Sequence, residues 1–284
     1  MVVEAWICMF CGNEYVADLP DVCHICADDR QFIPPGGQRW TLLSDVRGGV
    51  TAAELEPGLF ELTVDPQVGS GQKTYVAATS DGCNILWEPP GFVGPALLDW
   101  LADHGGVGAI AASHPHLVGA AVSISHEFGR VPVWYNASDR RWVTRPDPVV
   151  AFWTDRQEIA DGITLVQCGG HFPGSAVAHL RDAADGRGAL LTGDTIMAVP
   201  HTQMVSFMRS YPNLIPLPPR LVRQIADQVG TLEFDRLYAA FGSPIEHDAA
   251  RIVEESARRY IGWVTDTITD PDDPGAPNTG QASG

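Results

Sequence analysis

Two histidines separated by a single residue, His114 and His116, follow a short apolar segment near the middle of the chain. That segment, residues 107–112, holds small and β-branched residues between a pair of glycines and Pro115, which predicts a buried strand that ends in a turn. A turn at a strand end can aim both imidazoles at one point, where they could bind a metal ion. Taken alone, the two histidines could equally be ordinary solvated loop residues.

Three more potential metal ligands stand after apolar segments that we predict to be strands. His171 follows residues 162–168, Asp194 follows residues 188–191, and the segment 241–247 near the end of the chain ends in His247. The alternation of these strands with helical segments indicates a layered α/β sheet. Five potential ligands, counting the His-x-His pair, therefore follow predicted strands.

Four cysteines near the N-terminus form two Cys-x-x-Cys pairs, separated by eleven residues. These are Cys8, Cys11, Cys23 and Cys26. This spacing suits tetrahedral thiolate ligation, and a segment of about 35 residues has so little core that a metal ion would be needed to hold its shape. The segment resembles short rubredoxin-like and zinc-ribbon knuckles. We expect a structural Zn²⁺ here, with an electron-transferring iron as the alternative.

The composition is that of an ordinary globular protein. The 284 residues are 45% hydrophobic, and 35 acidic residues against 18 basic ones give a formal charge of −17 without a Lys/Arg cluster. Nucleic acid and anionic membrane surfaces are therefore unfavourable partners, and we expect a small-molecule substrate instead. No stretch approaches the roughly 20 apolar residues that span a bilayer. We expect a cytoplasmic protein, which fits reduced cysteines; the sequence does not predict the oligomeric state.

The pattern divides the chain into three parts. Residues 1–36 form the cysteine unit, residues 37–268 the main domain, and residues 269–284 a polar, Pro- and Gly-rich tail that we expect to be disordered. Predicted strands cover residues 59–64, 75–79, 83–87, 107–112, 131–135, 162–168, 176–180 and 188–191. Predicted helices begin near residues 95, 118, 218 and 248.

The order of the motifs resembles the metallo-β-lactamase superfamily. His-x-His is followed by Gly-His-x-Pro-Gly-Ser, then by Thr-Gly-Asp, and late in the chain by Gly-x-x-x-x-His, and the resemblance covers roughly residues 55–265. It implies a four-layer αββα sandwich, in the α/β and α+β class, with metal held at one edge of the two sheets. It assigns His114, His116 and His171 to a first metal site, Asp194 to a bridging carboxylate, and His247 to a second site.

One departure from the family pattern affects the predicted chemistry. The first motif of the family usually continues as His-x-His-x-Asp-His, whereas Val118 and Gly119 occupy the last two positions here. Because those positions supply second-site ligands in the family, we expect a single Zn²⁺ in the main site, with iron as the alternative. Three imidazoles with an open fourth position would lower the pKa of a bound water to about 7. Asp194 and His247 are the predicted catalytic residues.

The resemblance implies a metal-dependent hydrolase that acts on an ester, thioester, lactone or amide bond. One alternative is an iron oxidoreductase of the persulfide dioxygenase type, with iron held by His114, His171 and Asp194. Another is a binding protein without turnover. The Pro-rich segment 206–213 is predicted to wall the substrate pocket, with Arg209 as a candidate contact for a substrate carboxylate. His201 could reach the site from a loop.

Overall fold

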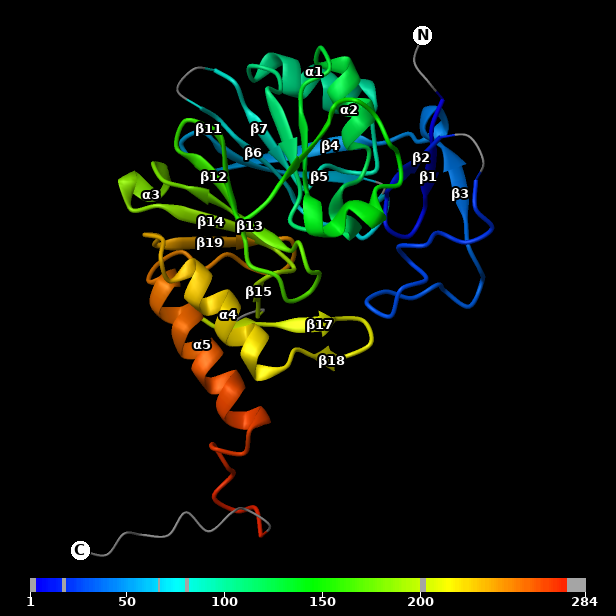
Figure 1. Ribbon diagram of the computed structural model, residues 1–284. Coiled ribbons are helices and arrows are strands. Elements are labelled where there is room, and N and C mark those ends of the chain that lie inside the picture. Colours follow the sequence, from blue (N-terminus) through cyan, green and yellow to red (C-terminus); the bar gives the residue numbers. More distant parts are fainter. Residues whose placement is uncertain (1–3, 17–18, 66, 80–81, 200–202, 275–284) are drawn as a thin grey trace, which may run out of the picture.

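Two β-sheets packed face to face form the centre of the main domain (Figure 1). The computed structural model describes residues 4–16, 19–65, 67–79, 82–199 and 203–274. The first sheet has the strand order β10-β9-β8-β7-β6-β5-β4. Its strands are β4 (Gly49–Glu56), β5 (Leu59–Asp65), β6 (Thr74–Ala77), β7 (Ile85–Trp87), β8 (Ala109–Ala111), β9 (Val133–Asn136) and β10 (Val150–Trp153). Strands β4 to β7 pair antiparallel, and β7 to β10 pair parallel.

The second sheet has the order β11-β12-β13-β14-β19. It consists of β11 (Arg156–Ala160), β12 (Ile163–Gln167), β13 (Ala176–Leu180), β14 (Ala189–Gly193) and β19 (Arg236–Ala239), and the short segment α3 (Ala183–Gly186) joins β13 to β14. Strands β11 to β14 form an antiparallel meander, whereas β14 and β19 are parallel. Strands β12 and β14 therefore end at the same edge of the sheet.

Helices cover the outer face of each sheet, which gives the four-layer αββα sandwich that the sequence predicts. Helices α1 (Pro95–Asp103) and α2 (Ala121–Glu127) pack on the first sheet, and α4 (Pro219–Val229) and α5 (Ala249–Val264) pack on the second. Three apolar layers result, one between the sheets and one under each helix pair. In the described part of the chain, no helix is long and apolar enough to cross a membrane.

Most predicted elements are present within a few residues of their expected bounds. In the two main sheets, strands β4, β10, β11 and β19 have no counterpart among the predicted strand ranges. In β4 most residues are exposed, because it is an edge strand paired on one side, so its sequence lacks a clear apolar alternation. Residues 269–274 contain neither helix nor strand, and residues 275–284 of the predicted tail lie outside the described residues.

The N-terminal unit forms its own sheet against the main domain. Strand β1 (Trp6–Cys8) pairs with β2 (Glu14–Tyr15) and with β3 (Trp40–Leu42). This sheet extends past the predicted boundary at residue 36. Two short hairpins complete the fold: β15 (Met197–Ala198) with β16 (Val205–Ser206), and β17 (Met208–Ser210) with β18 (Ile215–Pro216).

A buried ion pair anchors the N-terminal unit to the main domain. The carboxylate of Glu14 accepts hydrogen bonds from the backbone N–H groups of Val122 and Ser123, at the beginning of helix α2. Arg145 donates to the same carboxylate at 2.5 Å, and the two side chains are only 4% and 3% exposed. A carboxylate at a helix N-terminus is favourable because it satisfies free N–H donors and complements the helix dipole.

We predict that Arg145→Met lowers the free energy of unfolding by about 3 kcal/mol or more, because it leaves the Glu14 carboxylate buried without its cation. Denaturant unfolding measures this change. The control is Arg251→Met, since Arg251 forms an exposed ion pair with Glu255 on helix α5. We expect that exposed variant to unfold as the wild type does; equal stability of both variants would contradict the anchoring role of Arg145.

Candidate metal centres

Three histidines and one aspartate meet at the edge where the two sheets open. His114 and His116 follow β8, His171 follows β12, and Asp194 follows β14. One potential ligand atom from each of the four side chains lies within 4.8 Å of the others, and all four residues are buried. We call this group the His/Asp cluster. It contains four of the five ligands that the sequence analysis named for the main site.

Two of the three imidazoles in the cluster, those of His114 and His171, are oriented by hydrogen bonds on their outer nitrogens. Nδ1 of His171 lies 3.2 Å from the carbonyl oxygen of Met208, and Nδ1 of His114 lies 2.7 Å from the hydroxyl of Ser113. The inner nitrogens face one another: Nε2 of His171 is 3.4 Å from Nδ1 of His116. Nε2 of His114 is 3.7 Å from Oδ2 of Asp194. Outer partners of this kind fix the tautomer of a metal-binding histidine.

Burial controls the charge of these groups. It lowers the pKa of His114 and His116 well below the ordinary value and lowers that of His171 to about 3, so all three imidazoles are neutral at pH 7. Burial also raises the pKa of Asp194 to about 7. Nε2 of His114 and Oδ1 of Asp194 are buried without a hydrogen-bond partner. Neutral imidazoles and a carboxylate with unpartnered inner atoms fit a divalent transition metal.

The structure does not bring His247 into the cluster, which corrects the prediction that it is a second-site ligand and a catalytic residue. Its imidazole is 69% exposed, and its Nδ1 lies 3.5 Å from the carboxylate of Asp235. The chain turns away after β19, and Phe241 is the residue from this segment that lines the cleft beside Asp194. His201 lies outside the described residues.

Val118 and Gly119 stand where the family motif usually has Asp-His, and they have an apolar and a steric role. Val118 packs against apolar side chains on both sides of the turn. Gly119 has φ +55°, and a Cβ added there would lie 2.1 Å from the carbonyl oxygen of Pro89. A histidine at this position would therefore require the backbone to move, so the turn has a shape that excludes that ligand.

Two residues support the cluster in roles that the sequence did not indicate. The backbone N–H of Ser113 donates to Oε1 of Glu88 at 2.8 Å, and Glu88 is fully buried beneath the turn. Gly193, at the end of β14, has φ +52°, and its Cβ would lie 2.0 Å from the Ser113 hydroxyl oxygen. Only a glycine lets β14 approach closely enough to place Asp194 beside His114. Glu88 belongs to no motif, so spacing gave no signal for it. Gly193 stands in the Thr-Gly-Asp motif, but the motif was used only for its aspartate.

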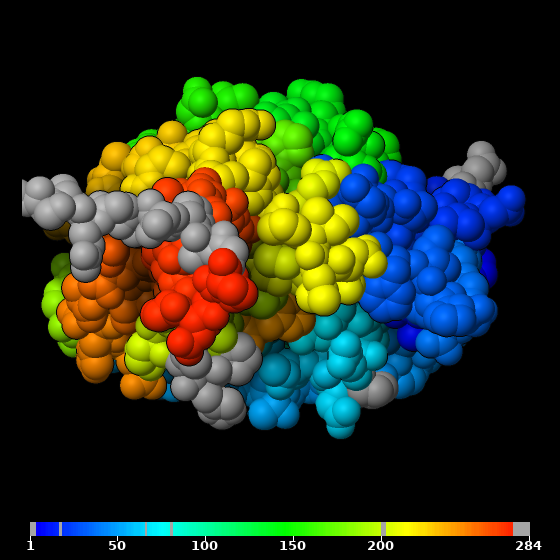
Figure 2. Space-filling view, turned by 90° about the horizontal axis from the view of Figure 1, so that it is seen from below, coloured from blue at the N-terminus to red at the C-terminus, as the bar shows by residue number. Residues whose placement is uncertain are grey.

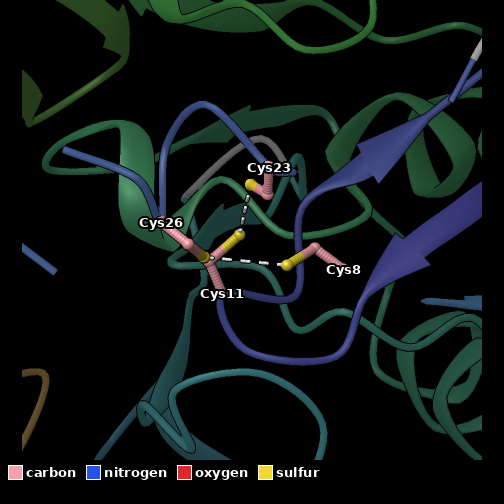
Figure 3. A group of neighbouring side chains, drawn as sticks. All are labelled: Cys8, Cys11, Cys23 and Cys26. Atoms are coloured by element: carbon pink, nitrogen blue, oxygen red, sulfur yellow. Dashed lines mark hydrogen bonds between the residues drawn. The ribbon is translucent and has the colours of Figure 1, made fainter. Parts of the chain in front are cut away.

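The four N-terminal cysteines form a second buried group (Figure 3). We call it the four-cysteine site. The Sγ atoms of Cys8 and Cys26 are 3.7 Å apart, and those of Cys11 and Cys23 are 3.8 Å apart. A tetrahedral ion with metal–sulfur bonds of about 2.3 Å requires sulfur separations of about 3.8 Å. The four sulfurs are reduced and are too far apart for disulfide bonds. This geometry fits a bound metal ion and leaves no open coordination position.

The N-terminal unit, described over residues 4–16 and 19–42, contacts the loops that carry the histidines. The side-chain amide of Asn13 donates to the carbonyl oxygens of Pro115 and His116, at 3.1 and 3.2 Å. Nε of Arg30 donates to the carbonyl oxygen of His171 at 2.6 Å, and its guanidinium lies 4.2 Å from the centre of the Phe172 ring. The two candidate metal centres are therefore joined through the backbone of the ligand loops.

A cleft of about 430 Å³ lies above the His/Asp cluster. His116 and Asp194 line it, together with residues of the N-terminal unit and of the hairpin β17-β18. Tyr211 and Pro212, in the turn of this hairpin, form part of the wall, as expected for the segment 206–213. Arg209 is paired with Asp29 of the N-terminal unit at 2.7 Å and is not among the residues that line the cleft.

Solved structures with the same fold include metallo-β-lactamases. VMB-1 is 10% identical, with a TM-score of 0.58 over 77% of this chain and 100% of that chain. The DIM-1 metallo-β-lactamase is 12% identical, with a TM-score of 0.57 over 75% of this chain and 99% of that chain. The mono-zinc form of the FIM-1 metallo-β-lactamase from Pseudomonas aeruginosa is 13% identical, with a TM-score of 0.55 over 75% and 96%. The fold of this chain is therefore the metallo-β-lactamase fold.

The sequence comparison gives a nearer relative. YmaE of Bacillus subtilis (strain 168), described as an uncharacterized protein, is 38% identical over 263 residues, which are 90% of this chain and 95% of YmaE. The chain belongs to the family of YmaE, within the metallo-β-lactamase fold. No protein-family model matches the sequence.

We predict that the affinity of the His/Asp cluster for Zn²⁺ decreases below pH 7. A cation held by the histidines and a proton on the neighbouring carboxylate of Asp194, whose pKa is about 7, disfavour each other, so the dissociation constant should rise up to about tenfold per pH unit as the pH falls. The histidines add little to this slope, because burial keeps them neutral. Competition with a chelator between about pH 5.5 and 8 measures the slope. Asp194→Asn should remove it, and a wild-type affinity that is constant from pH 6 to 7 would contradict the assignment.

We predict that Gly119→Ala destabilises the protein more than Gly129→Ala does. Both glycines have positive φ, which costs about 1–2 kcal/mol for alanine, but a Cβ at Gly129 meets no atom within 4 Å. The additional loss of stability at Gly119 measures the steric clash of the added Cβ with the carbonyl oxygen of Pro89. Thermal unfolding of both variants tests this, and equal losses would show that the turn has room for a side chain.

Proposed function

We propose that this chain is a mononuclear zinc hydrolase that cleaves an ester, thioester, lactone or amide bond in a small-molecule substrate. The observation that carries the proposal is that buried imidazoles and a buried carboxylate, with unpartnered inner atoms, open onto a cleft. A metal site with a purely structural role is normally closed by four protein ligands and needs no cleft. The four-cysteine site has that closed form, and the His/Asp cluster does not.

His114, His116 and His171 would hold the metal ion, since their inner nitrogens are neutral and face a common point. Zn²⁺ bound there would supply Lewis acidity and an acidified water molecule. The hydrogen bond of His171 to Met208 leaves the lone pair of Nε2 directed inward. Among the described residues, only these two groups of four donors gather closely enough to bind a metal, which supports one ion in the main site.

Asp194 is the best candidate for proton transfer. It lines the cleft, and its Oδ1 is unpartnered, so it can accept a proton or a hydrogen bond from the attacking water. The hydroxyl of Tyr211 donates to the backbone carbonyl oxygen of Asp194 at 3.0 Å. Tyr211 therefore positions the loop of Asp194 and is not free to act as an acid toward the substrate.

The metal content of the full-length protein tests the proposal. We expect two Zn²⁺ per chain in the wild type and one in His116→Ala, because the four-cysteine site keeps its ion. We also expect the variant to lose nearly all esterase or amidase activity in a screen of small substrates. His247→Ala is the matched control, since His247 lies outside the cluster, and it should keep both ions and full activity.

Other outcomes would contradict this function. Activity retained in His116→Ala would exclude the metal-dependent mechanism. Iron in the His/Asp cluster, with oxygen uptake on a persulfide substrate, would favour the oxidoreductase alternative, which gains no support from the solved relatives. Loss of zinc or activity in His247→Ala would show that the C-terminal segment reaches the site after all.

A further inference from the structure

The cleft above the His/Asp cluster has one wall made by the N-terminal unit. Met9 and Phe10 line it from the first cysteine pair, and Gln31, Phe32 and Pro34 line it from the segment after the second pair. In Figure 2, the blue N-terminal unit lies beside the yellow segment that contains the hairpin β17-β18. A segment that the sequence marks only as a metal-binding module therefore forms part of the substrate cleft.

The cysteines hold Met9 and Phe10 in place. Both residues stand between Cys8 and Cys11, so any ion at the four-cysteine site closes the turn that carries them. Backbone hydrogen bonds reinforce this turn. The N–H of Gly12 donates to the carbonyl oxygen of Cys8 at 2.8 Å, and the N–H of Met9 donates to the carbonyl oxygen of Arg39 at 3.1 Å. The two side chains are thus presented to the cleft by a rigid loop.

The segment around Phe32 is held by the hairpin β17-β18. The side-chain amide of Asn213, in the turn of β17-β18, donates to the carbonyl oxygens of Asp29 and Gln31 at 3.0 and 2.8 Å. Arg209 pairs with the Asp29 carboxylate at 2.7 Å. Phe32 itself is 51% exposed, although the backbone on its N-terminal side is held. A large apolar side chain that stays half exposed on a fixed backbone can contact a ligand without rearrangement.

The chemistry of the cleft favours an uncharged, apolar group. The wall formed by the N-terminal unit faces a cleft to which Leu117, Met197 and Phe241 also contribute apolar surface. Among the described residues that line the cleft there is no lysine or arginine, and the one acidic residue is Asp194 of the cluster. An anionic substituent would meet no positive side chain there, whereas an aromatic or alkyl group would bury its surface against thioether and phenyl groups.

We propose that the N-terminal unit is the substrate-recognition element of this protein, in which Met9, Phe10 and Phe32 bind an uncharged aromatic or alkyl substituent of the substrate. The scissile bond of that substrate would lie over the His/Asp cluster, so the inference rests on the proposed function. The specificity-determining residues lie outside the segment, residues 55–265, that resembles the superfamily. The four-cysteine site then acts on substrate choice by holding the recognition loop, with no direct part in bond cleavage.

Two hydroxamic acids test this inference on the zinc-loaded, full-length protein. Acetohydroxamic acid and 3-phenylpropanohydroxamic acid offer the same metal-binding group and differ in their apolar substituent. We expect calorimetry to show that the phenylpropano compound binds at least about tenfold more tightly. Phe32→Ala and Met9→Ala should reduce this ratio several-fold and leave the affinity for acetohydroxamic acid unchanged. Trp263→Ala, which removes a 47% exposed aromatic side chain on helix α5, is the control and should keep the wild-type ratio.

The possible results separate the two proposals. Equal binding of both hydroxamic acids by the wild type would overturn the recognition role and leave the metal centre supported. An unchanged affinity ratio in both Phe32→Ala and Met9→Ala would also overturn it. Failure of both compounds to bind the loaded protein would contradict the metal centre itself, and the recognition role would fall with it.

Discussion

Burial of ligand atoms without hydrogen-bond partners is the constraint on which the main site depends. A buried polar atom that finds no partner costs a few kcal/mol, and the inner atoms of His114 and Asp194 both lack one. A single cation would satisfy them together. The surrounding structure holds these atoms together despite this cost. Gly193 lets β14 come close to the turn at Ser113, and neighbouring groups form hydrogen bonds with the outer nitrogens of His114 and His171.

The N-terminal unit also brings buried potential metal ligands together, in this case four cysteine sulfurs. Its own core is small, so it is stabilised where four sulfurs meet and where it contacts the main domain. Glu14 binds the beginning of helix α2, and Asn13 and Arg30 bind carbonyl oxygens beside the ligand histidines. The unit is therefore part of the site, and its position influences both the ligand loops and the cleft above them.

The departure from the family motif follows from the local backbone. At Gly119 the positive φ and the nearby carbonyl oxygen of Pro89 exclude a side chain, and Val118 completes an apolar layer. Phe241, which follows β19, adds a ring to the cleft beside Asp194. Groups that would attract a second ion are replaced by apolar surface, which is consistent with a site that binds one metal and an uncharged substituent.

The sequence by itself predicted most of the strands from local apolar patterns and glycine turns, and the order of its motifs predicted the sandwich. It also named four of the five donors correctly as residues that gather in one cluster, because each follows a strand that a few residues define. Tertiary structure decided what depends on distant segments. His247 was predicted as a ligand from its position after a strand, but the chain after β19 turns it into solvent beside Asp235. The support from Glu88 and the place of Met9 and Phe32 in the cleft arise only when separate loops meet. No spacing rule encodes such contacts, since they are set by how whole layers pack.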